Sequence, residues 1–211
     1  MGQVRREQLG RAREGMKLGM AMPFDAAFTS PYKGRLILEM RDARSDELLH
    51  YQTLDNIITK DAGIASAAHY TGDLEGGLVM LAIGTGATGN LLNPDAPQNT
   101  QRKLNNEIQR KGFASKQYRT AQGVAVSYYT NVVDFTTTFG EAEAVGPLNE
   151  MGLMVTASQN PASQALIANG PNDYDATIDV TAKDLLVNYI TFAVVSKPAT
   201  AVLSITWRLS F

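Results

Sequence analysis

A glycine-rich segment has the residue spacing that most invites a chemical interpretation. Gly84-Thr-Gly86-Ala-Thr-Gly89 fits the pattern G-x-G-x-x-G and directly follows a continuous apolar run. In a dinucleotide-binding fold, the last glycine opens a helix whose N-terminus receives the pyrophosphate. Here Pro94 and Pro97 follow closely, and they would break such a helix. The motif therefore predicts a loop that leaves a strand, and we expect no cofactor.

Cysteine and histidine, which often serve as nucleophile and base, are scarce. The chain has no cysteine and two histidines, His50 and His69. Disulfides, thiolate metal sites and thiol catalysis are therefore excluded. The histidines fall in an expected hairpin strand and in an expected short helix, with neither a G-x-S-x-G elbow nor H-x-x-x-H spacing in the sequence. We interpret both as packed or surface residues and expect neither enzymatic activity nor a metal site.

Acidic residues gather in two segments. Glu141, Glu143 and Glu150 surround Gly146-Pro147, and a glycosidase would need two such groups facing each other across a cleft. Because no signal for an aromatic-lined cleft accompanies them, a solvated acidic loop is the better interpretation. The segment 172–175 (Asn-Asp-Tyr-Asp) offers oxygen ligands for calcium, but it lacks the length and terminal glutamate of an EF-hand loop.

Residues 1–34 are predicted to form an extended arm rather than a folded unit. Glycines recur in the basic first half and weaken any helix, and Pro23 and Pro31 punctuate the second half. We expect the arm to contact a neighbouring subunit, and a disordered tail is the alternative. The expected contact residues are Arg5, Arg6, Arg11, Arg13, Lys17, Phe24, Phe28 and Tyr32.

The charge balance bears on what the arm contacts. The net charge of the chain is −2, whereas general nucleic-acid binders carry a strong positive excess. Since the arm is basic, the remainder of the chain is acidic and can supply surfaces that attract it. We therefore expect protein partners and not nucleic acid, although arm arginines that touch packaged nucleic acid stay an alternative.

From residue 35 onward the apolar pattern predicts mainly strands. Residues 35–42 alternate with a period of two, 43–47 form a polar turn, and 48–54 can return as the second strand of a hairpin. Thr59 is a plausible N-cap for a short helix over about 60–70 that ends at Gly72. The apolar run 78–83 predicts a strand buried on both faces, followed by a long loop over 84–101.

The second half of the chain is predicted to be almost entirely β. Residues 102–111 are either a helical turn or an extended connector, and strands over 113–121 and 124–139 flank the turn signal Gln122-Gly123. This interpretation places Tyr128 and Tyr129 within a strand. The further expected strands are 151–157, 177–181, 185–195 and 200–211, with a loop over 158–174. In the last strand Trp207 lies on the strictly alternating apolar face.

These elements define the expected fold class. About seven to nine strands with one or two short helices predict a mainly β domain over residues 35–211, an antiparallel, jelly-roll-like β-sandwich preceded by the arm. No stretch approaches the roughly 20 apolar residues that cross a bilayer, and no secretory signal is apparent, so we expect no membrane partner.

The order of several stretches resembles a broad group of small virion proteins of tailed bacteriophages, which serve as decoration, tail or fibre-associated subunits. The stretches are 54–63 (LDNIITKDAG), 81–86 (LAIGTG), 104–110 (LNNEIQR), 133–139 (VDFTTTF), 148–153 (LNEMGL) and 197–211 with its ITWRL core. The resemblance covers about residues 35–211 and excludes the arm. It implies a β-sandwich module that joins oligomers on the particle, and it brings no catalytic residues.

Two glutamates within these stretches invite a physical interpretation of their own. Glu107 and Glu150 each stand beside apolar residues, where a strand leaves the core. A carboxylate in such a place can accept backbone N–H groups or pair with an arginine such as Arg110. We therefore expect both to serve folding and not catalysis.

The expected function follows from the arm, the sandwich and the resemblance together. We expect a non-enzymatic bacteriophage virion structural protein, assembled in the host cytoplasm, and in the first place a capsid cement or decoration subunit. It would be a homo-oligomer that contacts the major capsid protein or tail proteins. A tail, collar or baseplate component is the alternative. A receptor- or carbohydrate-binding module is the second alternative, and it would require exposed aromatic side chains on loop tips.

Overall fold

The computed structural model describes residues 33–72, 77–156 and 184–211. Three predicted features lie outside these ranges: nearly all of the arm, the loop over 158–174 with the acidic segment 172–175, and the strand over 177–181. Lys33 and Gly34, the last two residues of the predicted arm, open the first strand.

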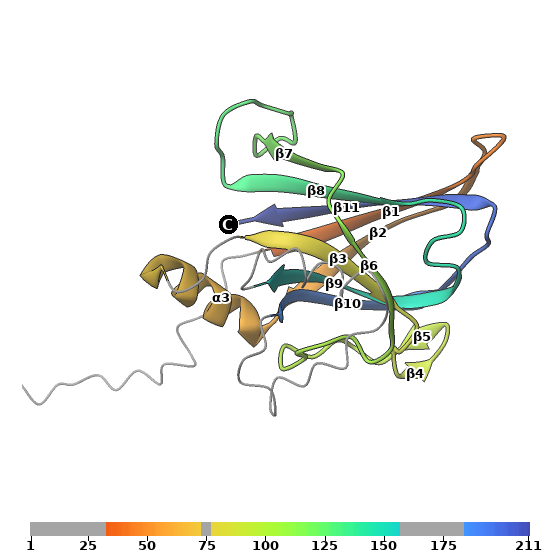
Figure 1. The fold of residues 1–211 in the computed structure, drawn as a ribbon, viewed down its shortest axis with the longest axis horizontal. Coiled ribbons are helices and arrows are strands. Elements are labelled where there is room, and N and C mark those ends of the chain that lie inside the picture. Colours follow the sequence, from red (N-terminus) through yellow and green to blue (C-terminus); the bar gives the residue numbers. More distant parts are fainter. Residues whose placement is uncertain (1–32, 73–76, 157–183) are drawn as a thin grey trace, which may run out of the picture. The chain divides into compact units, whose positions relative to one another are not determined.

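Within the described residues the chain forms strands and one helix, which confirms the mainly β prediction (Figure 1). The elements are β1 (Lys33–Asp42), β2 (Leu48–Ile58), α3 (Lys60–Thr71), β3 (Leu78–Gly84), β4 (Gly89–Asn90), β5 (Asn93–Pro94), β6 (Glu107–Gly112), β7 (Ser115–Arg119), β8 (Val132–Phe139), β9 (Gly146–Thr156), β10 (Asp184–Lys197) and β11 (Ala201–Ser210).

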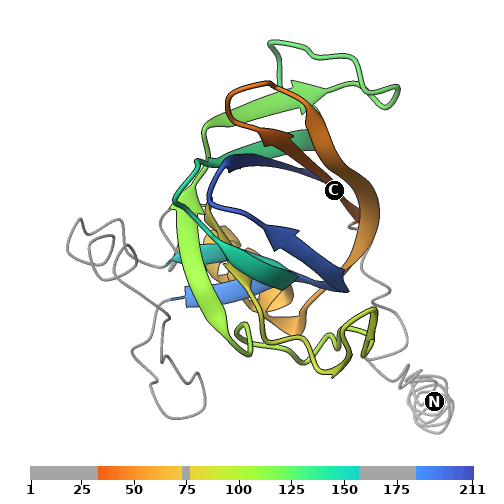
Figure 2. The same ribbon diagram turned by 90° about the vertical axis from the view of Figure 1, so that its right-hand side faces the viewer.

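Nine strands form one antiparallel sheet in the order β6-β3-β9-β10-β2-β1-β11-β8-β7, and β4 and β5 form a separate small hairpin. The strand β2 turns a corner: it pairs with β1 along most of its length and with β10 only at Ile57 and Ile58. The two edge strands β6 and β7 are consecutive in the chain and are separated only by Phe113 and Ala114. The sheet therefore curls back on itself into a sandwich-like fold, as Figure 2 shows.

The main core fills the space inside the curled sheet. Along β11 every second residue from Ala201 to Leu209 is buried, as the strict alternation of the sequence predicted. Trp207 is fully buried there, and its indole N–H donates to Oδ1 of Asn56 at 3.1 Å. A buried tryptophan needs such a partner for its one polar group. The C-terminal strand is thus a central part of the core.

A second, smaller core lies on the outer side of β3, β9 and β10. It consists of Met80, Ala82, Leu104, Met154, Leu186 and Tyr189. Leu104 comes from the segment that precedes β6, so this segment covers the outer face of the sheet. Since Leu81 and Ile83 point into the main core, β3 is buried on both faces, as predicted from its continuous apolar run.

The helix matches its prediction except at its N-terminal cap. Helix α3 ends at Gly72, whose φ of 80° is the left-handed conformation that glycine adopts easily. Thr59 stands at the N-cap position, but its hydroxyl donates to the carbonyl oxygen of Leu186 instead of accepting from the helix. The threonine therefore ties the helix to β10.

The predicted strand over 124–139 is wrong in its first half, and β8 begins only at Val132. Both neighbours of β8 end level with this residue, because Val132 pairs with Arg119 of β7 and with Ser210 of β11. The chain instead folds back along β7 as a loop, in which Ala125 pairs with Arg119 and the Val126 N–H donates to the carbonyl oxygen of Tyr118 at 3.0 Å. Tyr128 and Tyr129 lie on this loop and are 61% and 88% exposed.

Three other predicted segments begin or end at different residues in the structure. The strand predicted over 113–121 shrinks to β7, and the ambiguous segment 102–111 is a connector that becomes strand β6 at Glu107. β9 begins at Gly146, five residues before the predicted start, because its first residues pair with the end of β10.

Candidate functional site: a polar pocket beside the glycine-rich loop

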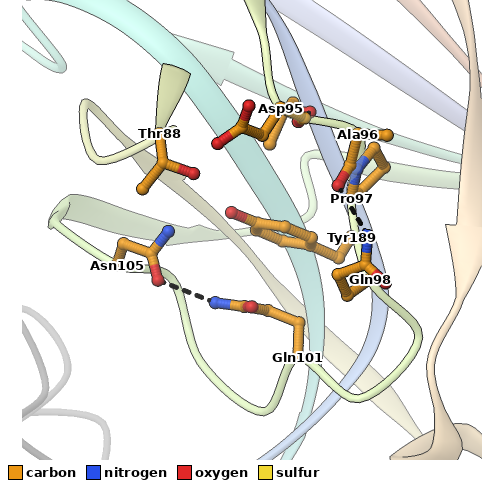
Figure 3. Close-up of a pocket in the computed structure, with 9 residues that line it drawn as sticks. Thr88, Asp95, Ala96, Pro97, Gln98, Gln101, Asn105 and Tyr189 are labelled. Atoms are coloured by element: carbon orange, nitrogen blue, oxygen red, sulfur yellow. Dashed lines mark hydrogen bonds between the residues drawn. The ribbon is translucent and has the colours of Figure 1, made fainter.

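A pocket of about 480 Å³ opens beside the glycine-rich loop (Figure 3). Its lining comes from the segment between β3 and β6 and from β10. The lining residues are Thr88, Asp95, Ala96, Pro97, Gln98, Gln101, Asn105, Tyr189 and Thr191. Most of these side chains are polar, and the one charged residue among them is an acid.

Below the pocket, the carboxylate of Glu150 accepts four hydrogen bonds. Oε1 accepts the backbone N–H groups of Gly86 at 2.9 Å and Asn106 at 2.8 Å. Oε2 accepts the backbone N–H of Asn105 at 3.0 Å and the hydroxyl of Tyr189 at 2.7 Å. Glu150 is fully buried, so these donors replace the water it would otherwise bind. The prediction that Glu150 accepts backbone N–H groups is confirmed.

The glycines of the loop make this arrangement possible. A Cβ at Gly84 would lie 2.5 Å from the carbonyl oxygen of Asn106 and 2.6 Å from Oε1 of Glu150. A Cβ at Gly86 would likewise meet Oε1 of Glu150 at 2.6 Å. Distances this short are incompatible with a side chain. The G-x-G spacing therefore brings backbone N–H groups to an anion, and the anion is the protein's own carboxylate.

Tyr189 connects this buried carboxylate to the pocket. Its ring lines the pocket while its hydroxyl donates to Glu150. Burial, followed by the negative charge of Glu150, raises the pKa of the Tyr189 hydroxyl far above its usual value. In this site Tyr189 therefore acts as a hydrogen-bond donor to the buried carboxylate.

The backbone N–H and carbonyl of Asp95 are both hydrogen-bonded, whereas its side-chain carboxylate is available to a ligand. The Asp95 N–H donates to the carbonyl oxygen of Thr88 at 2.8 Å, and its own carbonyl accepts the hydroxyl of Thr191 at 2.8 Å. Its carboxylate has no hydrogen-bond or ion-pair partner among residues 33–72, 77–156 and 184–211. Figure 3 shows Asp95, Thr88 and the Tyr189 ring around one opening.

Amide side chains complete the rim, and their donors are directed into the protein. The Gln101 amide nitrogen donates to Oδ1 of Asn105 at 2.9 Å and to the carbonyl of Lys103 at 2.6 Å. The Gln98 amide nitrogen donates to the carbonyl of Ala96 at 3.2 Å. Within the described residues, no donor reaches the side-chain carbonyl oxygens of the two glutamines, which are left as acceptors. The pocket is therefore rich in acceptors and suits a ligand that brings donors.

Other buried charges have partners within the fold. Asp134 accepts hydrogen bonds from Arg208 at 2.7 Å and from Arg119 at 2.6 Å. Burial works to raise the pKa of Asp134, but the two arginines outweigh it and hold that pKa below its ordinary value. Glu107 forms a buried ion pair with Arg110, which confirms the predicted pairing. These groups hold strands together.

Lys197 is also buried. Its ammonium donates to the carbonyl oxygens of Gly140 at 2.8 Å and Glu141 at 3.2 Å, so it fixes the link between β8 and β9. Burial lowers the pKa of Lys197, and the charges of Glu143 and Glu141 offset part of this effect.

The other sequence candidates do not converge on the pocket. His50 lies in β2 beside Gln52, and His69 lies in the last turn of α3 beside Tyr70. Glu143 pairs with Lys111 at 2.5 Å and is separate from Glu150. In the described ranges no three His, Asp or Glu side chains gather as metal ligands would. The arm residues Arg5, Arg6, Arg11, Arg13, Lys17, Phe24, Phe28 and Tyr32 lie outside these ranges, as does the segment 172–175.

Sequence reasoning identified Glu150 but missed the pocket itself. Asp95 and Thr191 are 96 residues apart, and no motif links them.

Among the described residues, α3 is too short and too polar to cross a membrane. Comparison of the chain with models of known protein families gives no match, and comparison with curated proteins gives none either.

Proposed function

We propose that this protein is a non-enzymatic structural subunit of a bacteriophage particle, in the first place a capsid cement or decoration subunit. In this proposal it assembles in the host cytoplasm, becomes part of the virion, and contacts copies of itself and the major capsid protein. The basic arm and the exposed loops of the β domain, called the body here (residues 35–211), make these contacts. A tail, collar or baseplate position is the alternative within the same class.

The observation that carries this proposal is the placement of exposed apolar side chains in adjacent pairs on loops. Leu91 and Leu92 stand between β4 and β5 and are 60% and 77% exposed. Tyr128 and Tyr129 form a second such pair on the loop before β8. Single exposed apolar residues are common, but paired ones on protruding segments are typical of contact surfaces.

The construction of the body suits a subunit that presents loops and not sheet edges. An open edge strand can pair with the edge strands of other chains and cause aggregation. The edge strand β6 is covered by the link between β8 and β9, where the Ala144 N–H donates to Oε1 of Gln109 and Glu143 pairs with Lys111. Contacts with other subunits are therefore left to the loops and the arm.

A receptor- or carbohydrate-binding module is a second candidate, and one observation favours it. This function requires exposed aromatic side chains on loop tips, and Tyr128 and Tyr129 occupy such a place. Tyr118 meets Tyr129 edge to face with ring centroids 5.4 Å apart, which helps to hold the exposed ring. A glycan array distinguishes the two candidates, since binding that is lost in Tyr128→Ser and Tyr129→Ser would favour the receptor-binding module.

Deletion of residues 1–30 tests the structural proposal. The shortened chain should keep its cooperative unfolding transition, because the described core lies in later residues. Its incorporation into particles should fall strongly relative to the full-length chain, measured by quantitative mass spectrometry of purified particles. Incorporation at the full-length level would show that the arm does not link subunits.

A further inference from the structure

We infer that the pocket beside the glycine-rich loop binds the guanidinium or ammonium group of a basic residue from the arm of a second copy of this chain. The inference rests on the proposed function, and it names the surface that receives the arm. It gives the side chains of Asp95, Gln98 and Gln101 and the buried charge of Glu150 a role in binding a partner, in addition to their contacts within the chain.

The charge of the pocket favours a cation. Asp95 brings a carboxylate without a partner in the described part of the chain, and Glu150 brings a second one just behind Tyr189. Within the part of the chain that the structure describes, Glu150 is held by neutral donors, and no cationic side chain pairs with it. None of the nine lining residues is basic. A positive group that enters would interact with two carboxylates at once.

The hydrogen-bonding pattern favours a ligand rich in donors. The free acceptors are the Asp95 carboxylate and the side-chain carbonyl oxygens of Gln98 and Gln101, since the amide nitrogens of both glutamines are engaged. A guanidinium group carries five N–H donors and no acceptor. A phosphate would find few free donors here, and the carboxylates would repel it.

The arm is the occupant that the chain itself supplies. It carries four arginines and Lys17 within its first seventeen residues. The arm joins the body at Lys33, which pairs with Ser210 of β11. The pocket lies on the outer side of β10, on the other side of the corner that β2 makes. At no more than about 3.3 Å per residue, a chain from Lys33 can span at most roughly 50 Å to Lys17 and roughly 90 Å to Arg5, which is enough to arrive at a neighbouring subunit.

A lattice of subunits would strengthen such a contact. One arginine in an open polar pocket binds weakly, because solvent screens an exposed ion pair and both side chains lose conformational freedom. When each subunit both gives and receives an arm, many weak contacts act together and the assembly becomes stable. This is the behaviour expected of a subunit that links neighbours on a particle.

The test is a double-mutant cycle on the self-association of the full-length chain, measured by sedimentation velocity. Asp95→Asn removes the charge but keeps the size of the side chain, and it should weaken association about two- to fivefold. Changing the arm residues Arg5, Arg6, Arg11, Arg13 and Lys17 together to Gln should weaken it at least as much. Asp95→Asn should then add little to this arm variant, because both changes remove the same contact.

Glu47→Gln is the matched control, since Glu47 is an exposed carboxylate on the turn between β1 and β2. It should leave the association unchanged. Unaltered association of Asp95→Asn, an equal loss in Glu47→Gln, or full additivity of the arm and pocket changes would overturn the inference. Asp95→Asn should unfold at the same temperature as the wild type, which separates lost contact from lost folding.

Isotope mixing distinguishes a neighbour's arm from the chain's own. Full-length chains with ¹⁴N and ¹⁵N are mixed and treated with a carbodiimide, which joins the amine of Lys17 to a carboxylate in contact. Mixed-isotope Lys17–Asp95 products are expected, and products confined to one isotope would contradict the inference. A failure of the proposed function would show itself differently, as absence of the protein from purified particles.

Discussion

The carboxylate of Glu150 accepts the backbone N–H of Gly86 at 2.9 Å, and the approach leaves no space for a side chain at position 86. In nucleotide-binding loops, glycines let backbone N–H groups approach a phosphate in the same way. Here the negative group comes from β9 of the same chain. The glycine-rich loop is thus a structural element that fixes the segment from which the pocket is built.

Gly86→Ala should destabilise the protein by about 1–3 kcal/mol, because the added methyl group meets Glu150 and the backbone of Asn106. Chemical denaturation with an unchanged m-value would measure the loss. Gly63→Ala in α3 is the control: nothing lies within 4 Å of its Cβ, and alanine should stabilise the helix by about 0.5–1 kcal/mol. If the two changes altered the unfolding free energy equally, the close approach at Gly86 would not contribute to stability.

Glu150→Gln should cost about 2–3 kcal/mol of unfolding free energy. The amide nitrogen of glutamine would face donors that now point at a carboxylate oxygen, and one buried donor would lose its acceptor. Tyr189→Phe removes only one of the four donors and should cost about 1–2 kcal/mol. If Tyr189→Phe were the more damaging change, the carboxylate would not be the centre of this network.

Protonation of Asp134 should account for part of the loss of unfolding free energy at acidic pH. Its pKa is depressed in the folded protein, so its contribution is complete above the unfolded value of about 3.9 and is lost as the pH falls through the lower folded value. At pH 7, Asp134→Asn should cost about 2–3 kcal/mol, and the cost should shrink below about pH 4.

Asp55→Asn is the control for this pH series. Asp55 forms an exposed ion pair with Arg35 at 3.2 Å, and such pairs contribute at most about 1 kcal/mol. Urea titrations at pH 7 and pH 3 would compare both variants with the wild type. A cost for Asp134→Asn that does not change with pH would contradict the assignment.

Leu92→Ser should change the unfolding free energy by no more than about 0.5 kcal/mol, because Leu92 is exposed between β4 and β5. Its incorporation into particles should nevertheless fall if this loop contacts another subunit. Leu153→Ala, in the main core, should instead cost about 2–5 kcal/mol. Normal incorporation of Leu92→Ser would remove this loop from the contact surface.

Local patterns predicted much of the fold. The alternation around Trp207 indicated β11, the glycine at position 72 indicated the end of α3, and the setting of Glu150 beside apolar residues indicated a buried acceptor. Each of these features depends on neighbouring residues in the chain, so each can be read from a short segment.

Features that depend on distant partners could not be predicted in this way. Tyr128 and Tyr129 alternate with apolar residues like a strand, but they lie in a loop, because the preceding residues fold back along β7 and β8 begins only at Val132. The pocket escaped detection for a related reason. Asp95 and Thr191 meet only because β10 passes beneath the segment that follows the glycine-rich loop.

The central claim is that the protein is a structural part of a bacteriophage particle, and its copy number per particle tests this most directly. Purified particles would be analysed by mass spectrometry against labelled standards of this chain and of the major capsid protein. We expect a fixed ratio, with hundreds of copies for a capsid subunit or a small multiple of three or six for a tail position. Particles that lack the protein, or that carry it in a ratio varying between preparations, would contradict the claim.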